Sequence, residues 1–72
     1  MAKSVNQKLG DSIRSIRKER GISQEELAAK ADIERSYMGK IERGEANASV
    51  ATLFRISRSL KTNLSTLFAF DR

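Results

Sequence analysis

The sequence predicts an all-α fold, a compact bundle of five short helices in one domain. Apolar residues recur at three- and four-residue steps along most of the 72-residue chain, and no segment shows the two-residue alternation of a half-buried strand. The chain contains no Pro, and 39% of its residues are apolar, which suits continuous helices packed on one core. A chain this short buries roughly 60% of its unfolded surface, so a partner subunit would add stability.

The charge and the missing residue types narrow the possible functions. Fourteen Lys and Arg outnumber nine Asp and Glu, for a net charge of +5, and neither Cys nor His occurs. These absences exclude a disulfide framework, a thiolate zinc site and a Cys nucleophile, and they remove the commonest general base. We therefore expect a binding module rather than an enzyme, with no metal, cofactor or small-molecule ligand. A basic chain favours a polyanionic partner.

The distribution of apolar and basic residues carries two further expectations. No apolar run is long enough for a transmembrane helix or a signal peptide, so we expect a cytoplasmic protein without a membrane partner. Residues 1–20 hold six basic and two acidic side chains, and residues 46–72 hold four basic and one acidic. The solvated surface of a small domain can look the same, so charge alone does not assign nucleic-acid binding.

The first two helices are predicted from apolar spacing and capping residues. One helix face recurs at steps of 4, 4 and 3 through Val5, Leu9, Ile13 and Ile16. Ser4 or Asn6 can cap its start, and Gly21 marks its end. Ser23, with Glu26 three residues later, has the capping-box pattern and opens a second helix of about two turns. The apolar stripe of this helix is Leu27, Ala28 and Ala31.

Three more helices complete the predicted bundle. Asp32 interrupts the second helix, because Asp tolerates left-handed geometry better than most residues. A third helix is expected over residues 34–43, ended by Gly44. Ser49 can cap a fourth helix and Asn63 a fifth. The expected inner face of the fourth helix is Val50, Leu53, Phe54, Ser57 and Leu60, and the fifth helix holds Leu64, Leu67 and Phe68.

The third helix carries the most informative pattern. With Tyr37, Met38 and Ile41 inside, its outer face holds Arg35, Ser36, Gly39, Lys40 and Arg43. Such a face suits the DNA major groove, where Arg and Lys donate to guanine O6 and N7. Gly39 costs up to ~1 kcal/mol of helix stability relative to Ala, which a close approach to DNA or crowding between helices would explain. The alternative is a solvated amphipathic helix whose polar face binds nothing.

Two short helices joined by a tight turn over residues 23–43 form a helix-turn-helix. Residues 23–44, SQEELAAKADIERSYMGKIERG, closely resemble the lambda-repressor-like helix-turn-helix proteins of the Cro/C1 (Xre) type. The segments IRSIR (13–17), GISQ (21–24), NASV (47–50) and NLSTLF (63–68) resemble the same family. The resemblance covers about residues 7–68, which we take as the core of one DNA-binding domain over residues 1–72. Residues 1–5 are expected to be disordered.

The resemblance implies roles for individual residues. Base-edge contacts fall on Glu34, Arg35, Ser36, Gly39 and Lys40. Phosphate contacts fall on Gln24, Ser23, Arg43 and Asn47, and we add the basic Arg14 and Lys18 to them. Gln24 also holds the third helix in place in the family. Arg17 and Glu42 correspond to a structural pair between the first and third helices.

This sequence departs from the family pattern at four positions. One is Gly39, where the family usually has a side chain, so the base-reading role of this position is open. Asp32 stands where Gly is usual, Glu34 where a Ser or Thr cap is usual, and Ala48 where Pro is usual. A carboxylate at Glu34 favours the helix dipole but repels phosphate unless it accepts from cytosine N4. The base-reading role of Glu34 and the phosphate role of Asn47 are therefore open at this point.

The implied function is a sequence-specific double-stranded DNA-binding transcriptional regulator, a homodimer on a (pseudo)palindromic operator. Stand-alone bacterial and phage members include Cro-like repressors and the controller proteins of restriction–modification systems. We expect the dimer interface at Leu64, Leu67 and Phe70, although Phe70 folded back onto the core is equally open. Glu25 and Glu26 either contact the RNA polymerase sigma subunit, as in activating relatives, or favour the helix dipole.

The alternative function belongs to another class, a protein-interaction module such as an antitoxin or an adaptor. Its C-terminal apolar residues would then dock a different protein, and the polar face of the third helix would be incidental. An adaptor does not need Arg35, Ser36 and Lys40 together beside Gln24.

Overall fold

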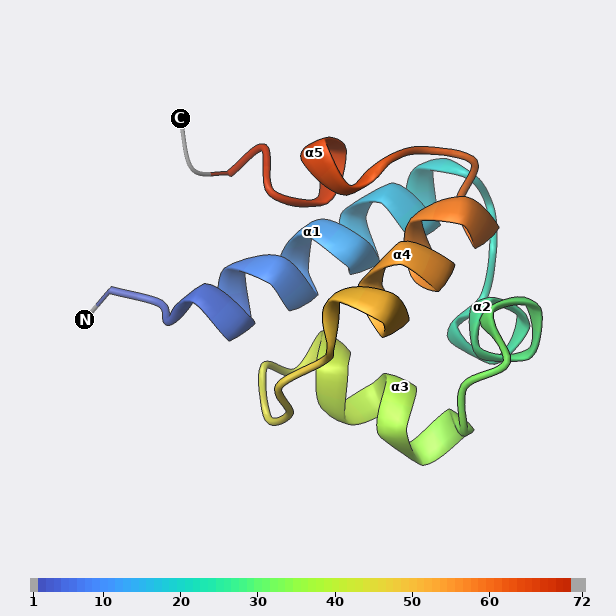
Figure 1. Ribbon diagram of the computed structural model, residues 1–72, viewed down its shortest axis with the longest axis horizontal. Helices are drawn as coiled ribbons and strands as arrows, with labels where there is room; N and C mark the ends of the chain where they lie inside the picture. Colours follow the sequence, from blue (N-terminus) through green and yellow to red (C-terminus); the bar gives the residue numbers. More distant parts are fainter. Residues whose placement is uncertain (1, 71–72) are drawn as a thin grey trace.

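The computed structural model describes residues 2–70. Five helices follow one another along the chain, and the described residues contain no strand, so the predicted all-α fold class is confirmed (Figure 1). The helices are α1 (Val5–Glu19), α2 (Gln24–Ala31), α3 (Arg35–Glu42), α4 (Val50–Ser59) and α5 (Leu64–Leu67).

Side chains cap the starts of four helices where the sequence predicts caps. Ser4, rather than Asn6, caps α1, because its Oγ accepts from the Gln7 N–H while the Gln7 side chain accepts from the Ser4 N–H. Ser49 caps α4, because its Oγ accepts from the Thr52 N–H. The other capping residues are Ser23 for α2 and Asn63 for α5. The expected disorder of residues 1–5 therefore does not hold for Ser4 and for Val5, the first residue of α1; Met1 lies outside the described residues.

The turn of the helix-turn-helix depends on Asp32. This residue ends α2 in the left-handed conformation, with φ 56° and ψ 50°, so Asp occupies a backbone position that usually favours Gly. The next residue, Ile33, donates its N–H to the Ala28 carbonyl at 2.9 Å, and its side chain is buried. The chain then enters α3 at an angle to α2, and the two helices pack against each other.

The core lies between α1, α2 and α4, closed by α3 and α5. In Figure 1, α3 lies on one side of α1 and α4, and α5 lies on the opposite side. α1 packs against α3, α2 and α5, and α4 packs against α2 and α5. The largest fully buried apolar side chains are Ile13, Leu27, Met38, Ile56, Leu60 and Leu67. Every helix contributes to this set, as expected for a single core.

The expected inner face of α4 is wrong at two positions. Val50 is 71% exposed and Phe54 is 49% exposed, whereas Ile56 is fully buried. The buried stripe is therefore Leu53, Ile56, Ser57 and Leu60. Phe54 and Ile56 lie on opposite flanks of Leu53, and apolar spacing alone fits either flank; packing against α2 and α5 selects Ile56.

Gly10 sets the distance between α1 and α3. A Cβ at this position would lie 2.4 Å from the Glu42 carbonyl oxygen and 2.6 Å from that of Ile41. Both of these neighbours are backbone atoms at the end of α3, so no side-chain rotation could relieve the overlap. The role of Gly10 was not predicted, because the backbone that it contacts lies more than 30 residues away in the sequence.

Candidate nucleic-acid interface

The outward side of α3 forms a shallow polar hollow. Its lining comes from both helices of the helix-turn-helix, with a volume of about 480 Å³, and consists of Gln24, Arg35, Ser36, Gly39, Lys40 and Arg43. Arg35, Ser36, Lys40 and Arg43 are exposed. Arg35, Ser36, Gly39 and Lys40, which were expected to read bases, thus lie on one surface with Gln24 and Arg43, which were expected to contact phosphates. Glu34, the fifth expected base reader, does not line this hollow.

Gly39 forms the floor of this hollow. A Cβ here would meet the Arg43 Nη1 at 3.1 Å and the Gln24 Oε1 at 3.6 Å, both of which are ends of flexible side chains. No helix backbone crowds Gly39, in contrast to Gly10. Crowding by the backbone of another helix therefore does not explain this glycine.

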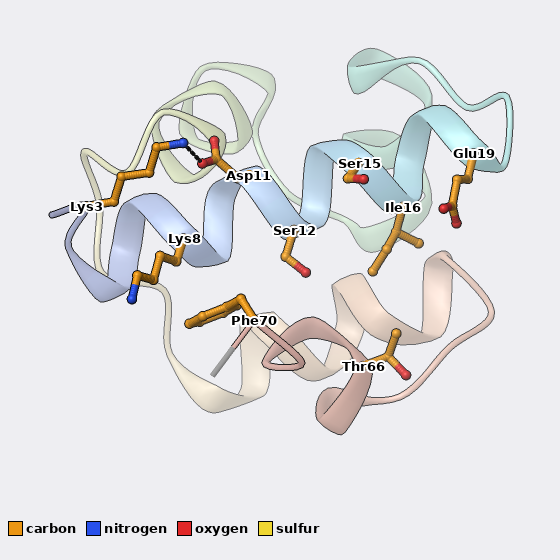
Figure 2. A pocket seen from close by; sticks show the side chains of 9 residues that line it. All are labelled: Lys3, Lys8, Asp11, Ser12, Ser15, Ile16, Glu19, Thr66 and Phe70. Carbon is orange, nitrogen blue, oxygen red and sulfur yellow. Dashed lines mark hydrogen bonds and ion pairs between the residues drawn. The ribbon is translucent and has the colours of Figure 1, made fainter. Parts of the chain in front are cut away.

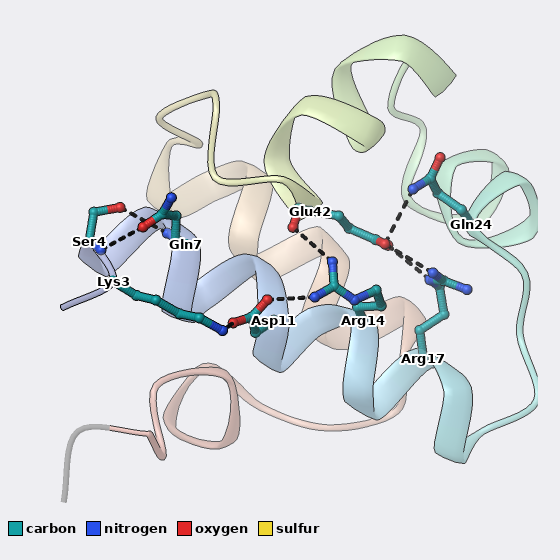
Figure 3. A network of polar contacts seen from close by, with 8 residues as sticks. All are labelled: Lys3, Ser4, Gln7, Asp11, Arg14, Arg17, Gln24 and Glu42. Carbon is teal, nitrogen blue, oxygen red and sulfur yellow. Dashed lines mark hydrogen bonds and ion pairs between the residues drawn. The ribbon is translucent and has the colours of Figure 1, made fainter. Parts of the chain in front are cut away.

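A buried ion pair holds α3 against α1 (Figure 3). Glu42 is 2% exposed, and its two carboxylate oxygens accept from the Arg17 Nε and Nη2, each at 2.9 Å. Arg17 also donates from Nη1 to the Ile22 carbonyl at 3.1 Å. The structure thus brings together the pair that the resemblance implied. Charge-assisted, two-point bonding of this kind fixes orientation as well as distance.

Gln24 joins the same network from α2. Its Nε2 donates to the Glu42 Oε1 at 3.2 Å, which links the first turn of α2 to the end of α3 (Figure 3). Its Oε1 is then directed toward the hollow, beside Gly39. This contact matches the expectation that Gln24 holds the third helix in place.

Arg14 lies in a different environment from the one expected. Its Nη1 donates to the Glu42 carbonyl at 3.3 Å, and its Nη2 pairs with Asp11 at 2.5 Å. Lys3 bonds the other oxygen of Asp11, and this bond, with the Arg14 pair, holds the pKa of Asp11 below its ordinary value. Arg14 is half-buried and caps the carbonyl end of α3, so its main contacts are structural.

Acidic side chains accompany both arginines of the hollow. The Glu25 carboxylate pairs with the Arg35 Nη1 at 2.9 Å, from the first turn of α2 to the first residue of α3. Glu45 accepts from the Arg43 Nε and Nη2 at 3.1 and 3.3 Å, and this hydrogen bonding lowers the pKa of Glu45. Neither pair was predicted, because Glu45 was assigned to a loop and Glu25 to a different contact.

Glu34 and Ser36 form a small acceptor group at the start of α3. Glu34 makes no capping bond to the helix; instead its Oε1 accepts from the Ser36 hydroxyl at 2.5 Å. The only proton of that hydroxyl is used, so the two residues together present lone pairs. Such a group suits a base-edge donor such as cytosine N4 or adenine N6.

The loop after α3 is tied to two helices. Asn47 Oδ1 accepts from the Asn6 side chain at 2.5 Å, and the Asn47 carbonyl accepts from the Tyr37 hydroxyl at 3.3 Å. Gly44 begins this loop with φ 76°, and a Cβ there would lie 2.8 Å from the Gln7 Cα. The loop therefore has a defined position although Ala48 replaces the usual Pro, and the Asn47 side chain is exposed.

The remaining expected contacts lie at the starts and ends of helices. Ser23 and Glu26 form the capping box of α2, and the bonds that Glu26 accepts from Ser23 lower the pKa of Glu26. Glu26 is therefore engaged within its own helix start rather than free. Lys18 is exposed in the last turn of α1, outside the lining of the hollow.

The expected dimer residues are largely part of the monomer. Leu67 is fully buried and so cannot meet another subunit, and Leu64 packs half-buried against the core. Phe70 folds back beside Ile16 and Ser12 of α1, where it lines an open groove of about 590 Å³ (Figure 2). That outcome is the alternative left open for Phe70. The exposed large apolar side chains are instead Val5, Val50, Phe54 and Phe68.

Two kinds of site are absent from the described part of the chain. Residues 2–70 contain no group of three or more acidic, His or Cys side chains placed to hold a metal ion. Within the same range, no helix combines the length and the apolar character needed to cross a membrane.

The chain matches known proteins over most of its length. The helix-turn-helix family HTH_3 matches residues 13–67. The control protein C.MunI from Mycoplasma sp is 40% identical over 63 residues, which are 86% of this chain and 85% of that protein. The immunity repressor protein of Bacillus phage phi105 is 41% identical over 59 residues, 82% of this chain but 41% of the repressor.

A solved structure is similar to this chain in both fold and sequence. The crystal structure of the restriction-modification controller protein C.AhdI from Aeromonas hydrophila superposes with a TM-score of 0.86 and 35% sequence identity, covering 88% of this chain and 96% of that chain. The chain therefore belongs to the helix-turn-helix family.

Proposed function

We propose that this protein, a DNA-binding transcriptional regulator, acts as a homodimer on a (pseudo)palindromic double-stranded operator. The exposed donor surface of α3 carries this proposal. Arg35, Ser36 and Lys40 lie on it, and the Arg17–Glu42–Gln24 network holds the helix behind them. A rigid helix with exposed polar side chains on its outer side is what direct readout in the major groove requires.

Each residue of the interface has a proposed role. Arg35 and Lys40 donate to guanine, the Glu34–Ser36 group accepts from cytosine N4 or adenine N6, and Gly39 lets the backbone approach. Arg43, Asn47, Ser23 and Lys18 contact phosphates. Gln24 contacts a phosphate with the Nε2 proton that Glu42 does not accept, because its Oε1 can only accept hydrogen bonds. Arg14 adds general attraction rather than a specific contact. Because phosphate neutralisation releases counterions, affinity should fall steeply with salt.

The proposed dimer rests on the size of one recognition helix. A single α3 covers only a few base pairs, and a two-fold pair of such helices reads half-sites about 34 Å apart. We place the interface on α4 and α5, where Val50, Phe54 and Phe68 are exposed, rather than at Leu67. Exposed aromatic side chains on a monomer surface are typical interface anchors.

The proposed biological role is a controller of restriction–modification genes or a phage-type repressor. Similarity to C.MunI, C.AhdI and the phage repressor supports both possibilities. A controller would bind its own promoter and either block polymerase or recruit it. Recruitment would involve the sigma subunit of RNA polymerase near the start of α2. Such a regulator would act in the bacterial cytoplasm, bound to the nucleoid.

In vitro selection on a random duplex library, at about 0.15 M salt, tests this function. We expect an enriched two-fold symmetric motif that contains a guanine in each half-site, and we expect Arg35→Ala to lose enrichment at that guanine. Binding with no enriched motif, lost on modest addition of salt, would contradict a sequence-specific regulator. That result would favour a protein-interaction module, an antitoxin or an adaptor, that docks through its C-terminal helices.

A further inference from the structure

The two arginines of the hollow are paired with acids through different parts of their guanidinium groups. Arg35 pairs with Glu25 through Nη1 at 2.9 Å. Arg43 pairs with Glu45 through Nε and Nη2, at 3.1 and 3.3 Å. Both pairs are exposed, since the Arg35 and Glu25 side chains are 72% and 67% exposed and those of Arg43 and Glu45 are 56% and 54% exposed. The difference between them is geometric rather than one of burial.

A guanidinium can donate two parallel N–H bonds from Nε and Nη2, or from Nη1 and Nη2. Reading guanine O6 and N7 needs one such edge. Glu25 occupies Arg35 at Nη1, so the Nε–Nη2 edge is left for a ligand. Glu45 occupies the Nε–Nη2 edge of Arg43, so that residue has its Nη1 side left, which lies over Gly39.

Arg17 is an arginine of this protein that is contacted both at Nη1 and along its Nε–Nη2 edge. Its Nη1 donates to the Ile22 carbonyl, and its Nε and Nη2 bind the two oxygens of Glu42 at 2.9 Å each. In this arginine a contact at Nη1 goes together with two-point bonding along the Nε–Nη2 edge. In Arg35 the group beside Nη1 is the Glu25 carboxylate, which forms an exposed ion pair at 2.9 Å rather than a hydrogen bond. The Nε–Nη2 edge, which binds Glu42 in Arg17, is left in Arg35 for a base.

We propose that Glu25 is a positioning residue that presents the Nε–Nη2 edge of Arg35 to a guanine and so sets specificity. This inference rests on the proposed function, because it requires that Arg35 reads a base. It also gives the two arginines different tasks: Arg35 discriminates between bases, and Arg43 makes a single contact to a phosphate. Glu25 then acts on DNA recognition through Arg35, rather than as a free acidic contact for polymerase.

The test compares Glu25→Gln with Glu45→Gln. Each change removes one exposed negative charge and replaces the ion pair of one arginine, Arg35 in α3 or Arg43 just after it, by a neutral contact, so general electrostatics change equally. Dissociation constants are measured by fluorescence anisotropy on the selected operator and on the same duplex with the guanine read by Arg35 replaced by adenine. Discrimination is the ratio of the two constants. Circular dichroism melting confirms that each variant is folded.

We expect Glu25→Gln to reduce discrimination by about three- to fivefold, the size of a well-oriented exposed ion pair. Glu45→Gln should leave discrimination unchanged and tighten binding to both duplexes. In an Arg35→Ala background, which itself loses roughly 5- to 150-fold of discrimination, Glu25→Gln should have no further effect on the ratio.

Two other results would overturn the inference in distinguishable ways. If Glu25→Gln tightens binding to both duplexes with the ratio unchanged, Glu25 is only a repulsive charge and the positioning role is wrong, although Arg35 still reads a base. If Arg35→Ala itself leaves the ratio unchanged, the proposed base contact fails, and the role of Glu25 fails with it.

Discussion

Glu42 shows how one buried side chain determines the orientation of the recognition helix. It accepts from Arg17 of α1 and from Gln24 of α2, and its backbone carbonyl accepts from Arg14. Three elements of the fold therefore meet at the end of α3. Removing this carboxylate would leave the Arg17 guanidinium, itself 11% exposed, without its counter-charge.

We expect Glu42→Ala to lower the free energy of unfolding by about 3–5 kcal/mol, because an unpaired buried charge costs far more than the pair contributes. Urea unfolding followed by circular dichroism measures the loss. The double variant Arg17→Ala/Glu42→Ala should lose less than the sum of the two single variants, since it leaves no uncompensated charge. A loss below about 1 kcal/mol for Glu42→Ala, the range of an exposed pair, would contradict this account.

Gly10 and Gly39 both lie inside helices, but their surroundings differ. The Cβ of Gly10→Ala would overlap the α3 backbone, so the variant must push α1 and α3 apart and should lose about 1–3 kcal/mol of stability. The Cβ of Gly39→Ala meets only movable side chains, so that variant should gain up to ~1 kcal/mol from helix propensity. Thermal melts of the two variants, which differ only in position, test the comparison; equal effects would refute it.

The start of α2 illustrates the stability of a single element. The Ser23 N–H and hydroxyl oxygen bond reciprocally with Glu26, and the N–H donated by Ser23 is the main reason that the pKa of Glu26 lies below its ordinary value of 4.5. A carboxylate whose pKa is lowered by folding adds stability above its unfolded pKa. That stability is lost as the pH falls through the folded pKa.

We therefore expect the stability that Glu26 contributes to be fully present above about pH 5 and to disappear on acidification below pH 4.5. The variant Glu26→Gln keeps a side-chain acceptor without the charge, so its stability should fall less between pH 6 and pH 3. Urea unfolding at several pH values compares the two proteins. Parallel pH profiles would mean that the ionised form of Glu26 has no preference for the folded state.

For the whole molecule, the exposed aromatic side chains of α4 and of the segment after α5 are the candidates for contact with a second copy. Phe54 of α4 is half-exposed, with the Arg58 guanidinium 5.7 Å from its ring centre. Phe68 lies beyond α5, and its ring centre is 5.9 Å from that of Phe70, with the two rings tilted by 42°. A 72-residue chain has a small core, so burial of these rings between two copies would add stability as well as symmetry.

We expect Phe54→Glu to weaken dimerisation by at least about thirtyfold, since truncated or charged aromatic anchors typically cost more than 2 kcal/mol. Sedimentation velocity at micromolar protein concentration measures the change. Val5→Glu is the matched control, because Val5 is also exposed but lies at the start of α1. If Phe54→Glu sediments like the wild type, the interface does not include this part of α4.

The predicted elements agree with the structure because their signals are local. Ser4, Ser23, Ser49 and Asn63 cap the helices for which the sequence predicts them, since a cap bonds a backbone N–H only three residues away. The polar outer side of α3 was predicted for the same reason, as helical periodicity assigns the faces of one helix. The Arg17–Glu42 pair required family resemblance, because 25 residues separate its partners.

The helices, their ends and the donor-rich surface of α3 thus follow from residues near one another in the chain. The partners of the arginines, the burial of Leu67, the exposure of Phe54 and the need for glycine at position 10 do not. These features depend on how α1, α3 and α4 pack on the other helices. Local propensity is set over a few residues, whereas the edge of Arg35 that is left for DNA depends on the angle at which α2 and α3 meet.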